Sequence, residues 1–322
     1  MDSIVILSLY VDHLLVTGDN KVQVEKLKGD LQKVFEMTDL GDMSYFLGMK
    51  VQQKKNEAFI CQKKYLREIL KKFKMEECKS ALTPMNLKEK LKKDDGSDAT
   101  DASRYRSLIG CLMYLTATRP NILLVVSVLS RYLSCASENH MVAAKRVVRY
   151  LKGTPSFGVK FCKSDQFKLH GYIDSDWAGS IDDISSGYCL SFGSTCFSWS
   201  SKKQDIVAQS IAEAKLIAAT TAANQAVWLR KLMNDLGFGV EEATTSYVDN
   251  QAAIAVSQNL VFHGKTKHFK VKYFYLREVQ HEGKVKLQHC SSEDQLADMF
   301  TKAFSVGQFN HLRQNIGVCI SS

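Results

Sequence analysis

The sequence predicts an α/β protein, and three observations lead to that fold class. Its 322 residues are 45% hydrophobic and 24% charged, which supplies enough apolar side chains for about two domain cores. Residues 103–152 follow a mainly helical hydrophobic pattern. From residue 157 onward, short segments rich in β-branched and aromatic residues are separated by Gly and Ser and then alternate with helical patterns. Alternating strands and helices are typical of a sheet covered by helices.

The N-terminal half begins with a hairpin at 4–17 and continues with a basic helix. Residues 63–75 place apolar side chains at helical spacing and lysines on the opposite face. The acidic, turn-rich stretch 94–101 predicts an exposed loop. The helical pattern of 103–152 ends at Gly153, because Gly followed closely by Pro is a typical helix stop.

The C-terminal half predicts one sheet of three meander strands and two later strands, with helices between them. A long Ala-rich amphipathic helix is expected over 208–236. The three meander strands are expected within the short segments 157–163, 167–179, 186–193 and 196–203. The other expected elements are a strand at 244–249, helices at 249–259 and 265–283, a strand at 284–290, and one last helix from about Ser292.

The formal net charge of +9 is concentrated in one stretch. Residues 50–93 hold 14 Lys or Arg and five Glu, an excess equal to that of the whole chain. The basic helix in this stretch is either a solvated lysine face or a surface that binds phosphates, which makes nucleic acid the expected partner. A second basic surface is expected around residue 265. The candidate nucleic-acid-binding residues are Lys63, Lys64, Arg67, Lys71, Lys72, Lys74, Lys265, Lys267 and His268.

Several function classes are disfavoured by what the sequence lacks. No run approaches the roughly 20 apolar residues of a membrane span, and the N-terminus lacks a basic signal-peptide region. The nine cysteines form no CxxC pair, so we expect reduced thiols rather than a zinc site. These features predict an intracellular protein, cytoplasmic or nuclear and not secreted, with no membrane partner. The oligomeric state stays open.

Three aspartates lie where strands end or helices begin. Asp174 lies on the first strand of the predicted sheet, Asp249 ends a later strand, and Asp298 falls on the last helix. Carboxylates that converge in this way could hold Mg²⁺ or Mn²⁺, the cations used for in-line cleavage of phosphodiesters. His289 is either a surface histidine at a strand end or a proton shuttle beside that site.

Ten segments, taken together, resemble the C-terminal part of a copia-type LTR-retrotransposon Pol polyprotein, the end of the reverse transcriptase followed by its ribonuclease H. They occur in the family's order over nearly 300 residues. They are LYVDHLLVTG at 9–18, MTDLGDMSYFLGMKV at 37–51, YRSLIGCLMYLTATRPNI at 105–122, AAKRVVRYLKGT at 143–154, GYIDSDWAG at 171–179, SWSSKKQDIVAQSIAEAKLIAA at 198–219, QAVWLRKL at 225–232, DNQAAI at 249–254, HGKTKHF at 263–269 and QLADMFTKAF at 295–304.

The resemblance implies three parts and a chemistry. Residues 1–82 resemble a partial palm hairpin and thumb, 83–160 a helical connection, and 161–322 a ribonuclease H-like domain with a mixed five-stranded sheet. That family cleaves the RNA strand of RNA–DNA hybrids with two Mg²⁺ ions held by three Asp and one Glu. Position by position, the three Asp are Asp174, Asp249 and Asp298.

The fourth acid of the resemblance is replaced by Lys215, in the segment Ala-Lys-Leu-Ile-Ala. Glu213 is expected to point away, because residues i and i+2 of a helix lie about 200° apart. An ammonium about 4 Å from a divalent cation costs on the order of 8 kcal/mol at an effective dielectric near 20. We therefore expect weakened Mg²⁺ or Mn²⁺ binding and impaired cleavage.

Two further departures from the family pattern matter. The polymerase motif reads Tyr10, Val11, Asp12, His13, with His13 where a second Asp is usual, and it stands close to the chain's first residue. We expect this polymerase part to be incomplete and inactive. Asn121 also stands where an Asp is common.

Two hypotheses follow about function. The first is a retrotransposon-derived ribonuclease H-like domain that has lost most or all catalysis and keeps binding to RNA–DNA hybrid or other nucleic acid. The alternative is a non-catalytic nucleic-acid-binding or structural remnant whose activity a Lys215→Glu change would not restore.

Overall fold

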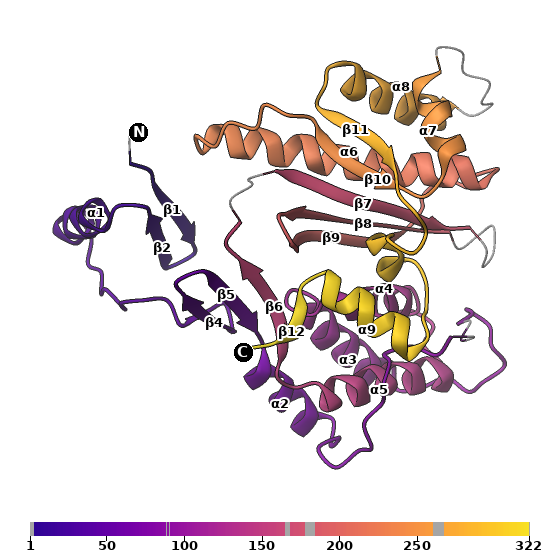
Figure 1. The fold of residues 1–322 in the computed structure, drawn as a ribbon. Helices are drawn as coiled ribbons and strands as arrows, with labels where there is room; N and C mark the ends of the chain where they lie inside the picture. Colours follow the sequence, from indigo (N-terminus) through magenta and orange to yellow (C-terminus); the bar gives the residue numbers. More distant parts are fainter. Residues whose placement is uncertain are drawn as a thin grey trace. The chain divides into compact units, whose positions relative to one another are not determined.

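The computed structural model describes residues 3–87, 89, 91–164, 168–177, 184–259 and 267–321 (Figure 1). The chain divides into two compact units. The smaller consists of Met1–Ser44 and Trp228–Glu241, and the larger of Tyr45–Val227 and Glu242–Ser322. No helix in the described ranges combines the length and apolarity that crossing a membrane requires.

The smaller unit contains the hairpin that the sequence predicted. Strand β1 (Val5–Tyr10) pairs antiparallel with β2 (His13–Gly18), and helix α1 (Lys21–Val34) follows. The side chain of Asn20 caps α1 by accepting from the backbone N–H of Val22. None of the residues 3–44 is buried, so this segment contributes no buried core residue of its own.

One sheet of the larger unit has the strand order β11-β10-β7-β8-β9. Strands β7 (Leu169–Asp176), β8 (Ser185–Phe192) and β9 (Thr195–Lys203) form an antiparallel meander. Strand β10 (Thr244–Val248) runs parallel to β7, and β11 (Val285–His289) runs parallel to β10. This mixed five-stranded sheet is the one that the sequence predicted.

A second five-stranded sheet, with the order β12-β6-β5-β4-β3, is antiparallel throughout. It joins segments that lie far apart in the sequence. Its strands are β3 (Tyr45–Phe46), β4 (Met49–Lys54), β5 (Glu57–Cys61), β6 (Phe157–Cys162) and β12 (Val318–Ile320). The sequence patterns at 45–61 and 318–320 did not predict these strands.

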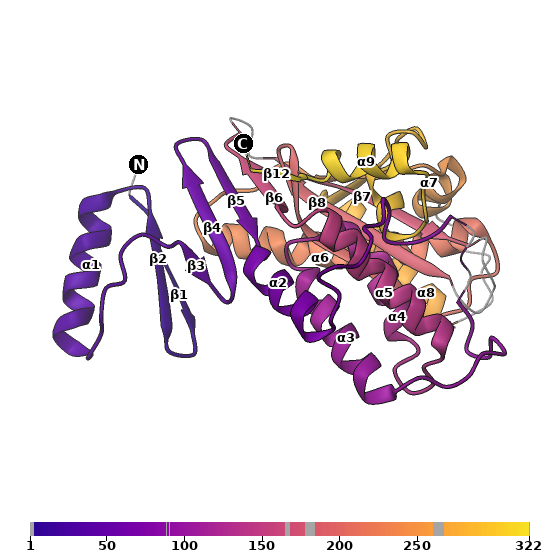
Figure 2. The ribbon, with the colours of Figure 1, turned by 90° about the horizontal axis from the view of Figure 1, so that it is seen from below.

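The main hydrophobic core lies among the helices before β6. Figure 2 shows these helices grouped together. Aliphatic side chains of this group and of the C-terminal helix share one buried cluster, as the helical pattern predicts. The helices are α2 (Lys63–Lys72), α3 (Ala102–Leu115), η1 (Pro120–Ile122), α4 (Leu123–Ser130), α5 (Glu138–Gly153) and α9 (Val306–Asn315).

In the described residues, three α-helices lie between β9 and β11 in the sequence. They are α6 (Ile211–Asp235), α7 (Gln251–Gln258) and α8 (Lys267–His281). Their positions agree with the helices expected at 208–236, 249–259 and 265–283, with ends shifted by one to three residues.

The prediction of one last helix from Ser292 is wrong. The segment forms a short 3₁₀ helix, η3 (Leu296–Phe300), and then the separate helix α9, whose N-cap is Ser305. Segment η3 packs tightly on β8, where a Cβ at Gly187 would lie 2.7 Å from the Cβ of Phe300. Glycine therefore permits the close contact. Asp298 consequently lies on a 3₁₀ turn over the sheet instead of on a regular helix.

Candidate functional site

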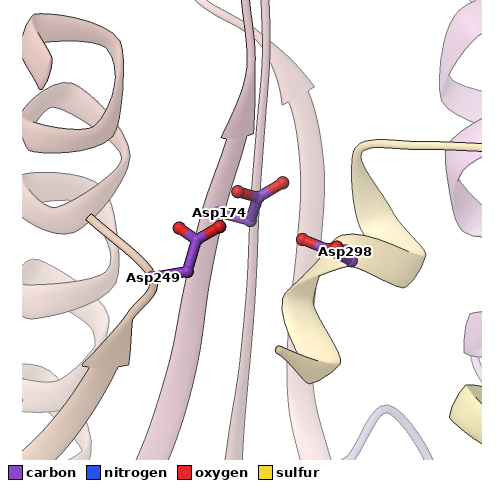
Figure 3. Close-up of side chains that lie close together, drawn as sticks. All are labelled: Asp174, Asp249 and Asp298. Carbon is purple, nitrogen blue, oxygen red and sulfur yellow. The ribbon is translucent and has the colours of Figure 1, made fainter. Parts of the chain in front are cut away.

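The structure brings the three predicted aspartates together at one end of the first sheet (Figure 3). In the parallel register Tyr247 lies opposite Tyr172, and Asp249 and Asp174 each follow two residues later. The two carboxylates therefore reach the same level of neighbouring strands. Asp298 approaches from η3, and one carboxylate oxygen of each aspartate lies within 4.8 Å of the others.

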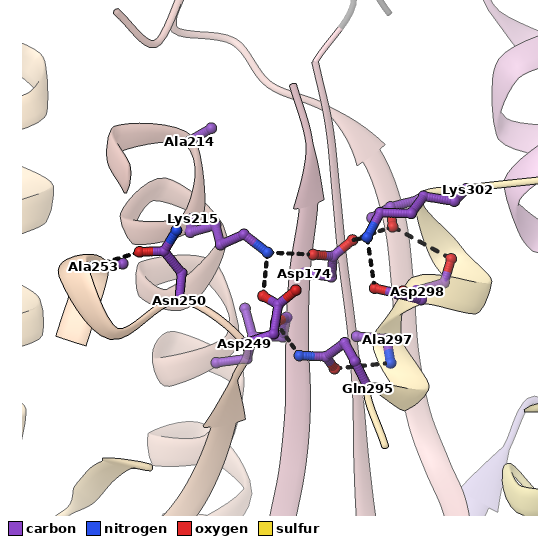
Figure 4. Close-up of polar contacts among 12 residues, drawn as sticks. Asp174, Ala214, Lys215, Asp249, Asn250, Ala253, Gln295, Ala297, Asp298 and Lys302 are labelled. Carbon is purple, nitrogen blue, oxygen red and sulfur yellow. Dashed lines mark hydrogen bonds and ion pairs between the residues drawn. The ribbon is translucent and has the colours of Figure 1, made fainter. Parts of the chain in front are cut away.

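Lys215 reaches into this cluster from α6 (Figure 4). Its Nζ lies 2.7 Å from Oδ1 of Asp174 and also donates to Oδ1 of Asp249. The side chain shares a helix face with Ala219 and Ala222, at i, i+4 and i+7, and this face is buried. Only 6% of Lys215 is exposed, so the ion pairs form away from water.

A second lysine, which the sequence reasoning missed, completes the cluster. Lys302 Nζ lies 3.0 Å from Oδ1 of Asp298 and 3.4 Å from Oδ2 of Asp174. The Thr301 hydroxyl donates to the same Oδ2 of Asp174. Three carboxylates thus face two ammonium groups. The spacing of Asp298 and Lys302 was an available signal for this ion pair, because residues four apart share one face of a regular helix.

Burial and the two lysines shift the pKa values of these groups in opposite directions. Burial raises the pKa of Asp174, but the Lys215 and Lys302 ammonium groups outweigh it and hold that pKa below its usual value. Burial and the neighbouring Asp174 charge raise the pKa of Asp298 to about 7. Burial lowers the pKa of Lys215 and of Lys302, yet the carboxylates outweigh it, so both pKa values are raised and both side chains stay charged at neutral pH.

Hydrogen bonds from two side-chain amides to the backbone position the elements that carry the cluster. The buried Gln295 amide donates to the carbonyl oxygen of Ile173 at 3.1 Å, and its Oε1 accepts from the N–H of Ala297 at 3.1 Å. The Gln295 side chain therefore links η3 to β7 by hydrogen bonds, next to Asp174. Asn250 follows Asp249 directly and caps α7 by accepting from the N–H of Ala253 at 2.8 Å.

The residues present do not fit the pair of divalent cations that the family pattern implies. The ammonium of Lys215 bridges Asp174 and Asp249, the position where a shared cation would need both oxygens. The other oxygen of Asp174 is held by Thr301 and Lys302. A cation with oxygen ligands would have to displace these donors and would meet two ammonium charges at close range.

Glu213 does not join the cluster. Its carboxylate accepts from the backbone N–H of Gln209 at 2.8 Å, and its own N–H donates to the Ser210 hydroxyl. It therefore points away from the cluster, as expected from its position two residues before Lys215, and it caps the first turn of α6.

The remaining candidates lie elsewhere. His289 is the exposed last residue of β11, and it lines a pocket with Tyr172 and Tyr247. In the described part of the chain, no hydrogen bond or ion pair joins it to the aspartates. Tyr10, Asp12 and His13 lie at the β1–β2 turn of the smaller unit, where His13 Nδ1 is 2.7 Å from Oδ1 of Asp12.

The basic helix α2 has the predicted two faces. Leu66, Ile69 and Leu70 are buried, whereas its basic side chains are exposed or partly exposed and form no ion pair with a described acid. Lys265 lies outside the described residues, as do the side chains of Lys267 and His268. The predicted basic residues of α2 and the residue after its C-cap are Lys63, Lys64, Arg67, Lys71, Lys72 and Lys74.

The strand order of the first sheet and the acid cluster define an α/β protein with a ribonuclease H-like part. The family model of reverse transcriptase (RNA-dependent DNA polymerase) matches residues 1–87. The retrovirus-related Pol polyprotein from transposon RE1 of Arabidopsis thaliana is 35% identical over 318 residues, covering 98% of this chain and 22% of that protein. An uncharacterised mitochondrial protein of the same plant is 35% identical over 69% of this chain and 93% of its own length.

The chain belongs to the family of copia-type retrotransposon Pol polyproteins. It spans about a fifth of the length of the RE1 polyprotein, namely 22%. Among solved structures, LC11-RNase H1 in complex with RNA/DNA hybrid is 18% identical, with a TM-score of 0.33 over 41% of this chain and 93% of that chain.

Proposed function

We propose that the ribonuclease H-like part of this chain binds RNA–DNA hybrid, or another nucleic acid, without cleaving it at an appreciable rate. The observation that carries the proposal is the position of Lys215 Nζ between Asp174 and Asp249. In-line cleavage of a phosphodiester by this class of site requires two cations that hold the attacking and leaving oxygens. An ammonium in that position can form ion pairs but cannot provide open coordination sites.

The polymerase part is included in this proposal as a nucleic-acid-binding segment. The match of the reverse transcriptase family model to residues 1–87 and the exposed basic face of α2 support a thumb-like role for that helix. Ammonium and guanidinium groups along one helix face are suited to successive phosphates. The Tyr10, Asp12 and His13 turn has one acid where the polymerase motif has two, which supports loss of polymerisation at this turn.

The test of the cleavage proposal uses a labelled RNA–DNA hybrid with Mg²⁺ or Mn²⁺. The full chain is compared with Lys215→Glu, which restores the fourth acid, and with Lys286→Glu, a matched reversal at an exposed position of β11. We expect no cleavage above background from the parent or from Lys286→Glu, and a gain for Lys215→Glu. Cleavage by the parent at the rate of Lys215→Glu would contradict the proposal.

A second candidate function, the non-catalytic binding or structural remnant, is favoured by Lys302. Its ammonium also pairs with Asp174 and Asp298, so a fourth acid at position 215 still shares the cluster with one partly exposed cation. If Lys215→Glu stays inactive while it binds the hybrid normally, the remnant is the better description.

The binding proposal is tested separately by a salt series. Affinity for the hybrid should fall steeply with salt, because phosphate contacts release counterions. Reversing Lys71 and Lys72 to Glu should reduce the slope of log K against log salt by roughly 0.7–0.9 for each lost contact. A salt-independent affinity, or equal slopes for this double variant and Lys286→Glu, would exclude α2 as the binding surface.

A further inference from the structure

We infer that the ammonium of Lys215 takes the structural place of a divalent cation, so that the acid centre of this fold is held together without metal. The inference rests on the proposed function, in which Lys215 occupies the cluster. It adds that Lys215 is required for stability and that it masks a cation site.

The geometry supports this role because Lys215 connects three separate elements. Its Nζ extends from α6 to Asp174 on β7 and to Asp249 directly after β10. The side chains of Asp174 and Asp249 are 0% and 10% exposed, so water does not screen them from each other. Two ionised carboxylates at this range repel strongly unless a cation lies between them.

Lys302 binds carboxylate oxygens on the other side of the cluster, so it does not replace the ion pairs that Lys215 forms. It contacts Oδ2 of Asp174 and Oδ1 of Asp298, whereas the oxygens that Lys215 contacts are Oδ1 of Asp174 and Oδ1 of Asp249. Asp249 has no ion pair with Lys302 in the described part of the chain. Without Lys215 it would face Asp174 with no cation bridging the two.

Two replacements at position 215 distinguish the effect of removing the ammonium charge from the effect of opening space beside the carboxylates. Lys215→Ala removes the charge and leaves room beside two carboxylates, which is the environment that Mg²⁺ or Mn²⁺ prefers. Lys215→Met removes the charge but keeps a long apolar side chain in the same space. Both variants should be less stable than the parent, and only the alanine variant should accept a cation.

The experiment measures thermal unfolding of the full chain and both variants in a chelator and then with added Mn²⁺. Isothermal titration with Mn²⁺ on the same samples gives the binding stoichiometry. We expect both variants to unfold at a lower temperature than the parent in the chelator. Added Mn²⁺ should raise the midpoint of Lys215→Ala by several degrees and leave those of the parent and Lys215→Met unchanged, because a ligand stabilises only the state that binds it.

Two results would overturn the inference. One is saturable, stoichiometric Mn²⁺ binding to the parent that raises its unfolding midpoint, and this is measurable even if neither variant folds. The other is a Lys215→Ala variant that folds with parental stability in the chelator and gains nothing from Mn²⁺. Hybrid cleavage by the parent would contradict the proposed function instead, so the two failures are distinguishable.

Discussion

Two buried charged regions of the larger unit depart from the family pattern in opposite ways. In the acid cluster, Lys215 stands where the resemblance implies a Glu. Beside Arg119, Asn121 stands where the resemblance implies an Asp. In the first region every charged side chain of the cluster forms an ion pair. In the second region the described acceptors of Arg119 carry no charge.

Arg119 is 2% exposed, and its acceptors in the described structure are neutral. Its guanidinium donates to the carbonyl oxygen and the hydroxyl of Thr154 at 2.9 and 2.7 Å, and its Nε to Oδ1 of Asn121 at 3.4 Å. The rings of Tyr150 and Phe157 lie 5.5 and 5.6 Å from the guanidinium carbon. Burial lowers the pKa of Arg119.

The difference shows that the starting charge balance decides how well a substitution is tolerated. A cation-binding site has an excess of carboxylates, so a lysine introduced there can form ion pairs with carboxylates that are already present. A one-to-one ion pair has no excess, so losing its acid leaves a buried cation with neutral acceptors only. We therefore expect the acid cluster to be the more stable of the two regions.

The largest expected effect comes from removing the centre of the acid cluster. Asp174→Asn leaves Lys215 and Lys302 without their shared carboxylate, and we expect the free energy of unfolding to fall by about 3–5 kcal/mol. Urea unfolding at pH 7 measures it. Asp205→Asn, at an exposed position, is the control, with an expected change within about 0.5 kcal/mol. Equal stability of the two variants would show that the cluster is not a balanced network.

A smaller effect of opposite sign is expected at the second region. Asn121→Asp supplies Arg119 with a carboxylate, and the Tyr150 hydroxyl, which now accepts from Asn121 at 2.7 Å, can donate to the new oxygen. We expect the free energy of unfolding to rise by about 1–3 kcal/mol. The exposed Asn56→Asp change, in the turn between β4 and β5, is the matched control. A loss of stability in Asn121→Asp would mean that Arg119 is adequately solvated by neutral acceptors.

The smallest effect is a pH dependence confined to the acid cluster. Since the pKa of Asp298 is about 7 in the folded chain and 3.8 ordinarily, the folded chain binds a proton that the unfolded chain releases between these values. Stability from this group is full below about pH 4 and is lost as pH rises through about 7. The free energy of unfolding of Asp298→Asn should thus gain about 1.4 kcal/mol relative to that of the parent between pH 6 and pH 8.

That gain is measured by urea unfolding of both proteins at the two pH values. The difference between Asp205→Asn and the parent should stay constant over the same range. A difference between Asp298→Asn and the parent that does not change with pH would show that Asp298 titrates normally.

Much of the candidate site could be predicted from the sequence because it follows strand and helix periodicity. The positions of Asp174 and Asp249 follow from two strands, and Lys215 lies at a helix position whose pattern resembles the family's. The contacts of Thr301 and Lys302 with Asp174 could not be predicted, because they depend on how the segment that contains the break between η3 and α9 packs on the sheet. That break is set by packing of η3 against β8 at Gly187, which is a contact between residues over 100 positions apart.

The sequence by itself determined the α/β class, the order of strands and helices in the ribonuclease H-like half, and the identity of the altered acid. These features are local, since they depend on side-chain spacing along one segment. The tertiary structure decided that two lysines form ion pairs with three aspartates, and that strands from 45–61, 157–162 and 318–320 share one sheet. Both depend on which distant segments meet, because ion pairs and sheet pairing act through space and have no period in the sequence.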